Sequence, residues 1–162
     1  MNIMRKEAII LASYLALFSL SPEQRESKIK DALVEEDEPV NEEAELLSLL
    51  RQYLYTELEI VTNSYLQEVL AENGLDAVVV GKEPQLYACE CCGYKTLERK
   101  GEYFICPVCF WEDDGNIDAD TYSHANKMTL REARDSFERS RFSGQNAGRI
   151  FNTDRLQRFH HK

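Results

Sequence analysis

Two short stretches give the clearest structural signal in this 162-residue chain: Cys89-Glu90-Cys91-Cys92-Gly93 and Cys106-Pro107-Val108-Cys109. Cys89 and Cys92 form one CxxC pair, and Cys106 and Cys109 form a second. The separation between the two pairs is typical of zinc ribbons. Two intervening residues let one tight turn direct both sulfur atoms at the same ion, and Gly93 can adopt the positive φ that such a turn requires. We therefore expect one structural Zn²⁺ ion, with four ligands: Cys89, Cys92, Cys106 and Cys109.

Four thiolates close the coordination sphere of zinc, so the predicted site is structural and has no open position for catalysis. A thioredoxin-like redox pair would not account for the second CxxC pair. An exported disulfide scaffold is disfavoured because all five cysteines lie within residues 89–109 and leave the rest of the chain without a crosslink. Cys91 is the odd thiol. We interpret it as a non-ligand, although exchange with Cys92 as ligand and a role as nucleophile stay open.

The residues around the two pairs predict a small β-hairpin module followed by a helix. Residues 94–98 and 102–105 are expected to be two strands joined through residues 99–101. Thr129-Leu130-Arg131-Glu132 matches a capping box and predicts the start of a C-terminal helix. Phe110 and Trp111 are expected to pack against that helix.

Residues 86–143 resemble the bacterial CPCC cysteine-rich domain family. The resemblance is carried by residues 87–97, 101–115 and 125–134, with one visible departure, because Glu90 stands where the motif that names the family has proline. It implies a zinc-binding domain of small bacterial proteins without established catalytic activity, sometimes encoded near toxin systems. It does not extend to residues 1–80.

The N-terminal half is acidic and helical. Residues 1–80 contain 16 acidic and 6 basic residues, whereas residues 81–162 contain 13 of each, so the whole formal charge of −10 is N-terminal. We predict a helix over residues 4–20, a second over 22–34 capped by Ser21, and a long third element from about residue 42 to 73 that breaks near Thr62. A short strand follows at residues 76–80.

The predicted fold class is therefore α+β: an N-terminal helical region, a small zinc-ribbon-like β-hairpin module and a C-terminal helix. The domain boundaries are an acidic helical region ending in a short strand at 1–80, a CPCC-type zinc-binding module at 81–143, and a basic tail at 144–162. We expect the basic tail to dock on another part of the same protein. The acidic half is one partner available for it. His160 and His161 are expected to be a frayed end rather than ligands.

The net charge disfavours unaided binding to nucleic acid or to an anionic membrane. The apolar run at residues 8–20 is too short to span a bilayer and no cleavage site follows it, which predicts a cytoplasmic location. No catalytic constellation is present, so an enzyme is not expected. We predict a bacterial immunity protein that inhibits a toxin by occluding its active site, and the alternative is a zinc-ribbon adaptor in transcription or RNA handling. The predicted partner-binding residues are acidic: Glu35, Glu36, Asp37, Glu38, Glu42 and Glu43.

Overall fold

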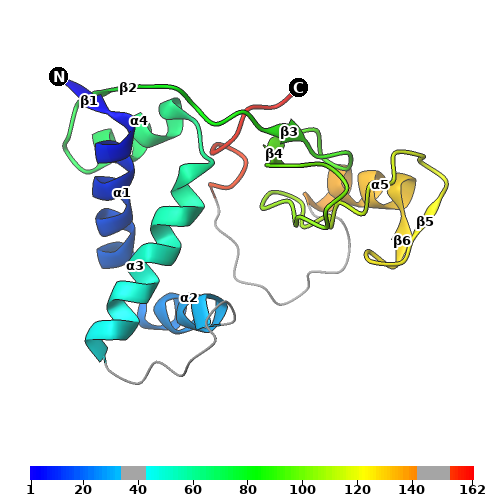
Figure 1. The fold of residues 1–162 in the computed structure, drawn as a ribbon, viewed down its shortest axis with the longest axis horizontal. Helices are drawn as coiled ribbons and strands as arrows, with labels where there is room; N and C mark the ends of the chain where they lie inside the picture. Colours follow the sequence, from blue (N-terminus) through cyan, green and yellow to red (C-terminus); the bar gives the residue numbers. More distant parts are fainter. Residues whose placement is uncertain (34–42, 142–153) are drawn as a thin grey trace. The chain divides into compact units, whose positions relative to one another are not determined.

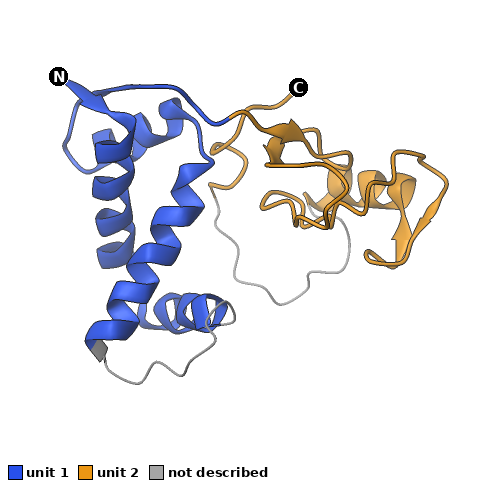
Figure 2. Ribbon diagram, in the orientation of Figure 1, with its two compact units in different colours: residues 1–84 blue, residues 85–162 orange. Residues whose placement is uncertain are grey.

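The computed structural model describes residues 1–33, 43–141 and 154–162, and its chain divides into two compact units (Figures 1 and 2). Unit 1 is Met1–Pro84 and unit 2 is Gln85–Lys162. Helices dominate unit 1, while short strand pairs and one helix make up the described part of unit 2. The predicted α+β class is therefore confirmed.

The described residues of unit 1 form four helices: α1 (Arg5–Ser19), α2 (Pro22–Leu33), α3 (Glu43–Glu59) and α4 (Asn63–Glu72). α1 packs along α3 and against α4, and α2 packs against α3. Leu17, Leu50 and Leu54 are buried where α1 meets α3. None of the helices in the described ranges combines the length and apolar character needed to cross a lipid bilayer.

Local hydrogen bonds set the starts of these helices. The Ser21 hydroxyl accepts from the amide of Gln24, and the Gln24 side chain accepts from the Ser21 amide, a reciprocal capping box that confirms the predicted cap. The predicted break in the long third element is also confirmed, since α3 ends at Glu59 and the Thr62 hydroxyl accepts from the amide of Tyr65 at the start of α4.

Arg5 stabilises this break from across unit 1. Its guanidinium is buried and donates to the carbonyl oxygens of Glu59 and Val61 and to Oδ1 of Asn63, at 2.8, 2.7 and 2.7 Å. Carbonyls at the end of a helix have no intrahelical donor. Arg5 supplies donors at that point and joins the start of α1 to the junction between α3 and α4.

A parallel strand pair completes unit 1. β2 (Val78–Val80) lies within the predicted strand at 76–80 and pairs with β1 (Asn2–Met4), which the sequence analysis did not predict. The side chain of Gln67 in α4 accepts from the amide of Val79 and ties the pair to the helices. Three residues are too few to show the alternation by which a strand is recognised in a sequence.

In unit 2, the residues that the structure describes form two antiparallel strand pairs and a helix. β3 (Tyr87–Ala88) pairs with β4 (Lys95–Leu97), β5 (Tyr122–Ser123) pairs with β6 (Met128–Thr129), and α5 (Leu130–Ser140) follows. The predicted capping box is confirmed: the Thr129 hydroxyl accepts from the amide of Glu132, and the Glu132 carboxylate accepts from the Thr129 amide.

The expected pairing of residues 94–98 with 102–105 is wrong. β4 pairs with β3 instead, and Ile105 forms an isolated antiparallel bridge with Glu112. Each cysteine pair therefore lies in the turn of its own short hairpin.

The end of the chain packs against the cysteine-containing part of unit 2. Phe159 is buried, and His161 forms an antiparallel bridge with Tyr94. The expectation of a frayed end at His160 and His161 is therefore wrong, because backbone and ring contacts fix this segment in place. The internal contact expected of the tail is made with the metal-binding module.

Candidate metal centre

Two turns of the same geometry present the four predicted ligands. Cys89 and Cys92 lie in the turn between β3 and β4, where the Gly93 amide donates to the Cys89 carbonyl at 2.9 Å. In the second turn the Phe110 amide donates to the Cys106 carbonyl at 2.8 Å. The residue after each pair has positive φ, 76° at Gly93 and 66° at Phe110. We call these turns the first knuckle (residues 89–93) and the second knuckle (residues 106–110).

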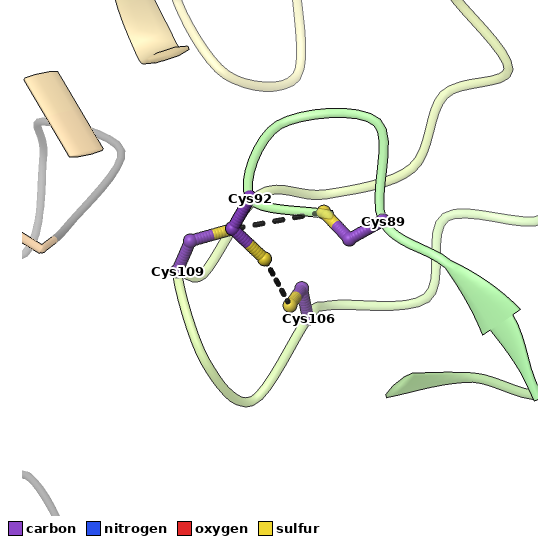
Figure 3. A group of neighbouring side chains, drawn as sticks. All are labelled: Cys89, Cys92, Cys106 and Cys109. Atoms are coloured by element: carbon purple, nitrogen blue, oxygen red, sulfur yellow. Dashed lines mark hydrogen bonds between the residues drawn. The ribbon is translucent and has the colours of Figure 1, made fainter. Parts of the chain in front are cut away.

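The knuckles bring the four sulfur atoms together (Figure 3). All four side chains are buried, and their Sγ atoms lie within 4.8 Å of one another. The sulfurs of Cys89 and Cys109, and those of Cys92 and Cys106, are 3.6 Å apart. A regular tetrahedron with metal–sulfur bonds of about 2.3 Å has edges of about 3.8 Å. The donor set and its spacing therefore fit a tetrahedral thiolate-bound ion such as Zn²⁺.

The thiols influence one another's protonation. Burial opposes ionisation of Cys106, but hydrogen bonds from Cys109, Cys89 and Cys92 hold the pKa of its thiol well below the ordinary value. The pKa of Cys92 is raised, mainly by its hydrogen bond with Cys106. Burial, followed by the hydrogen bond with Cys106, raises the pKa of Cys109. A divalent cation that binds here must displace protons from Cys92 and Cys109.

The part of the chain that contains this centre is similar to one known protein family. Residues 87–147 match the family model for the cysteine-rich CPCC domain. This confirms the resemblance seen in the sequence. No curated protein and no solved structure matches the chain. The CPCC domain contains both knuckles and α5 and excludes unit 1.

Side chains around the CPCC domain's metal centre bind the knuckle backbone. Arg134 of α5 donates from Nε to the carbonyl of Glu90 in the first knuckle at 2.9 Å. Arg155 donates from Nε to the carbonyl of Val108 in the second knuckle at 3.0 Å. Thr96 of β4 donates from Oγ1 to the Cys106 sulfur at 3.2 Å. These roles could not be predicted from the sequence, since no spacing rule connects such residues with the cysteines.

Cys91 lies outside the group of four. It is buried, with 8% of its surface exposed, and its place between Glu90 and Cys92 puts it in the first knuckle. The cluster of potential metal ligands in the described ranges consists of the four cysteines that the spacing predicts. Burial of Cys91 limits access of a substrate to its thiol.

The side chains of the predicted partner-binding residues are not among those that the structure describes. Glu35, Glu36, Asp37, Glu38 and Glu42 lie outside the described residues, and Glu43 begins α3 but its side chain is not among those described. Their role stays a prediction.

Proposed function

We propose that the protein is a zinc-stabilised protein-binding protein, in which the ion holds the CPCC domain in shape and the acidic unit 1 contacts a partner. Four buried cysteine sulfurs support a structural ion, because a tetrahedral site filled by thiolates has no ligand position left for water or substrate. We therefore propose that the protein acts through a binding surface and not through chemistry at the metal. We include a cytoplasmic location and the absence of catalysis in this proposal.

One observation carries the proposal: an exposed apolar row on α1. Leu11, Tyr14 and Phe18 are 38%, 43% and 78% exposed, and their spacing of three and four residues places them on one face of the helix. The opposite face is buried, where α1 packs against α3 and α4. No charged residue occurs in residues 8–20. A contiguous apolar row of this kind on a charged protein is typical of an interaction surface.

The charge of the same half of the chain favours a basic partner. The acidic excess of residues 1–80 attracts positive surfaces and accelerates encounter with them. We propose that the partner is a bacterial toxin that acts on nucleic acid, because the substrate cleft of such a toxin must attract phosphates. The protein then acts as an immunity protein, and its apolar row and carboxylates occlude that cleft.

The contacts of the basic residues count against the adaptor alternative. Arg155 is buried against backbone carbonyls, and Arg158 is paired with Asp154 at 3.2 Å. On α5, Arg131 is paired with Asp120 at 2.7 Å and Arg134 binds a backbone carbonyl. These arginines neutralise or bind protein groups, which weakens the case for a phosphate-binding stripe.

The test uses the zinc-loaded protein and the toxin candidate encoded by the adjacent reading frame. The wild type should protect cells from growth arrest by that toxin and bind it tightly in solution. Phe18→Asp should weaken binding at least about tenfold, since it places a charge in the apolar contact. The matched control is Ile117→Asp, because Ile117 is also an exposed apolar residue, 74% exposed, but lies in unit 2.

Charge reversal tests the electrostatic part. Replacing Glu35, Glu36, Asp37 and Glu38 by lysine should slow association and reduce its dependence on salt. Binding that is unchanged in both the Phe18 variant and the charge-reversed variant would contradict the proposed surface. Tight, salt-sensitive binding to RNA or DNA that is lost on deletion of residues 144–162 would favour the adaptor instead.

A further inference from the structure

We propose that residues 154–162 form a clamp on the metal centre, in which Arg155 compensates the charge of the sulfurs and His161 holds the first knuckle. This segment lies outside the CPCC domain, which ends at residue 147. The inference rests on the proposed structural zinc. It assigns control of metal retention to a part of the chain that the family match does not cover.

Arg155 brings a positive charge into the buried surroundings of the sulfurs. Only 9% of its surface is exposed, and its guanidinium donates to the carbonyls of Val108 and Arg141 at 3.0 and 3.1 Å. Val108 lies between the ligands Cys106 and Cys109. Burial lowers the pKa of Arg155, and the charge of the Cys109 sulfur opposes this shift, which places the guanidinium within electrostatic reach of the site.

A compensating charge matters because four thiolates outweigh one divalent cation. The zinc-loaded site carries net negative charge in a buried environment, where uncompensated charge is costly. Burying the positive charge of a guanidinium without a compensating negative charge is also costly. Placing the two close together reduces both costs, and it does so only while the segment that carries Arg155 stays docked.

His161 contacts the other knuckle. Its Nε2 lies 3.1 Å from the carbonyl oxygen of Cys92, and an N–H at that position donates to this ligand residue's backbone. The His161 ring meets the Tyr94 ring edge-on at 4.6 Å between centroids. Backbone pairing reinforces the contact, because the Lys95 amide donates to the His160 carbonyl at 2.8 Å and the Lys162 amide donates to the Gly93 carbonyl at 3.2 Å.

Gly93 shows how closely the segment approaches the first knuckle. A Cβ atom added there would lie 3.1 Å from Nε2 of His161, closer than ordinary van der Waals contact. The clamp thus touches the second knuckle through Arg155 and the first through His161. Zinc leaves a site of this kind when the two knuckles separate, and a segment that binds both resists their separation.

The test compares zinc release from full-length variants. Metal content is measured first, and each zinc-loaded protein is then mixed with an excess of a chelating dye that reports free zinc. Arg155→Gln, which removes the charge, and His161→Phe, which keeps a ring but removes the donor, should release zinc about 10- to 100-fold faster, the usual effect of losing an outer-shell partner. Arg155→Lys, which keeps the charge, should be affected less. The control is Arg139→Gln, an exposed arginine on α5.

A shortened chain that ends at residue 153 provides a second measurement. It should release zinc faster than the full chain, and a synthetic peptide of residues 154–162 should slow that release when added. Release at the wild-type rate from both the Arg155→Gln variant and the shortened chain would overturn the clamp. Equal acceleration in the Arg139 control would overturn it as well. A wild-type protein without zinc would contradict the proposed function itself, which separates the two failures.

Discussion

The hydroxyl of Thr96 lies 3.2 Å from the sulfur of Cys106 and donates a hydrogen bond to it. Thr96 belongs to β4, the strand that follows the first knuckle, whereas Cys106 belongs to the second. Both side chains are buried. One hydrogen bond therefore connects the hairpin of the first knuckle with a ligand of the second, and it stabilises the ionised form of that ligand.

Replacing Thr96 by valine should weaken zinc binding. The change keeps the shape of the side chain but removes the donor, and a hydrogen bond to a charged group contributes about 1.5–3 kcal/mol. This corresponds to a loss of about 10- to 100-fold in affinity, measured by competition with a chelator of known affinity. Thr96→Ser keeps the hydroxyl and should retain most of the affinity. Equal affinity in the valine variant and the wild type would contradict a role for this contact.

Zinc affinity should fall as the pH falls. The raised pKa values of Cys92 and Cys109 oppose loss of their thiol protons, and zinc binds only as those protons leave. More acid therefore favours the protonated, metal-free form. Chelator competition between about pH 8 and about pH 5 should show a steady loss of affinity. Calorimetry in buffers of different ionisation enthalpy should show proton release on binding, and an affinity independent of pH would contradict this account.

Removing the metal should unfold the CPCC domain and leave unit 1 folded. Structural zinc contributes about 10–16 kcal/mol in small zinc modules, more than two short strand pairs can supply. The only tryptophan of the chain, Trp111, is fully buried in unit 2, so its fluorescence reports on that unit alone. Prolonged chelation should shift its emission to longer wavelength.

The helical signal provides the control for this experiment. Unit 1 has its own core around Leu17, Leu50 and Leu54, and it contains four of the helices that the structure describes. Most of the far-ultraviolet circular dichroism should therefore survive chelation. Tryptophan emission that does not change after zinc has been shown to be gone would contradict the structural role of the ion.

Replacing Arg5 by leucine should destabilise unit 1. Arg5 is buried and supplies donors to Glu59, Val61 and Asn63, so its loss leaves the buried carbonyl of Val61 and two part-buried acceptors without these hydrogen bonds. Leaving such acceptors without a donor costs about 1–3 kcal/mol. Urea unfolding of the zinc-loaded protein, followed by helical circular dichroism, should show a lower midpoint. Lys6→Leu, at an exposed neighbouring position, is the matched control, and the same midpoint in the Arg5 variant and the wild type would rule out this role.

Features that depend on neighbouring residues could be predicted from the sequence. The caps at Ser21 and Thr129 and the break near Thr62 follow from side-chain groups within three residues of the amides they bind. The gathering of four sulfurs follows from two CxxC turns that each direct two side chains to one side. In both cases covalent connectivity limits the choice before any long-range packing occurs.

Features that depend on how separate segments of the chain meet in the fold could not be predicted in the same way. The hairpin expected for residues 94–98 and 102–105 is wrong, because the folded knuckles place other segments beside these residues. β4 pairs with β3, and Ile105 pairs with Glu112. The pairing of β1 with β2 joins residues more than seventy positions apart. In the sequence, Arg155 is one of several basic residues in the tail. Only the folded structure shows that it donates to the carbonyl of Val108.

Spacing and composition were enough to predict the group of four cysteines, the helical character of the first half and the location of the charge excess, because both are properties of the chain before it folds. The groups that surround the sulfurs, and the apolar side chains of α1 that stay exposed, could be identified only in the folded protein. Those properties arise from contacts between residues distant along the chain, where many alternatives have similar local cost and packing of the whole unit selects one.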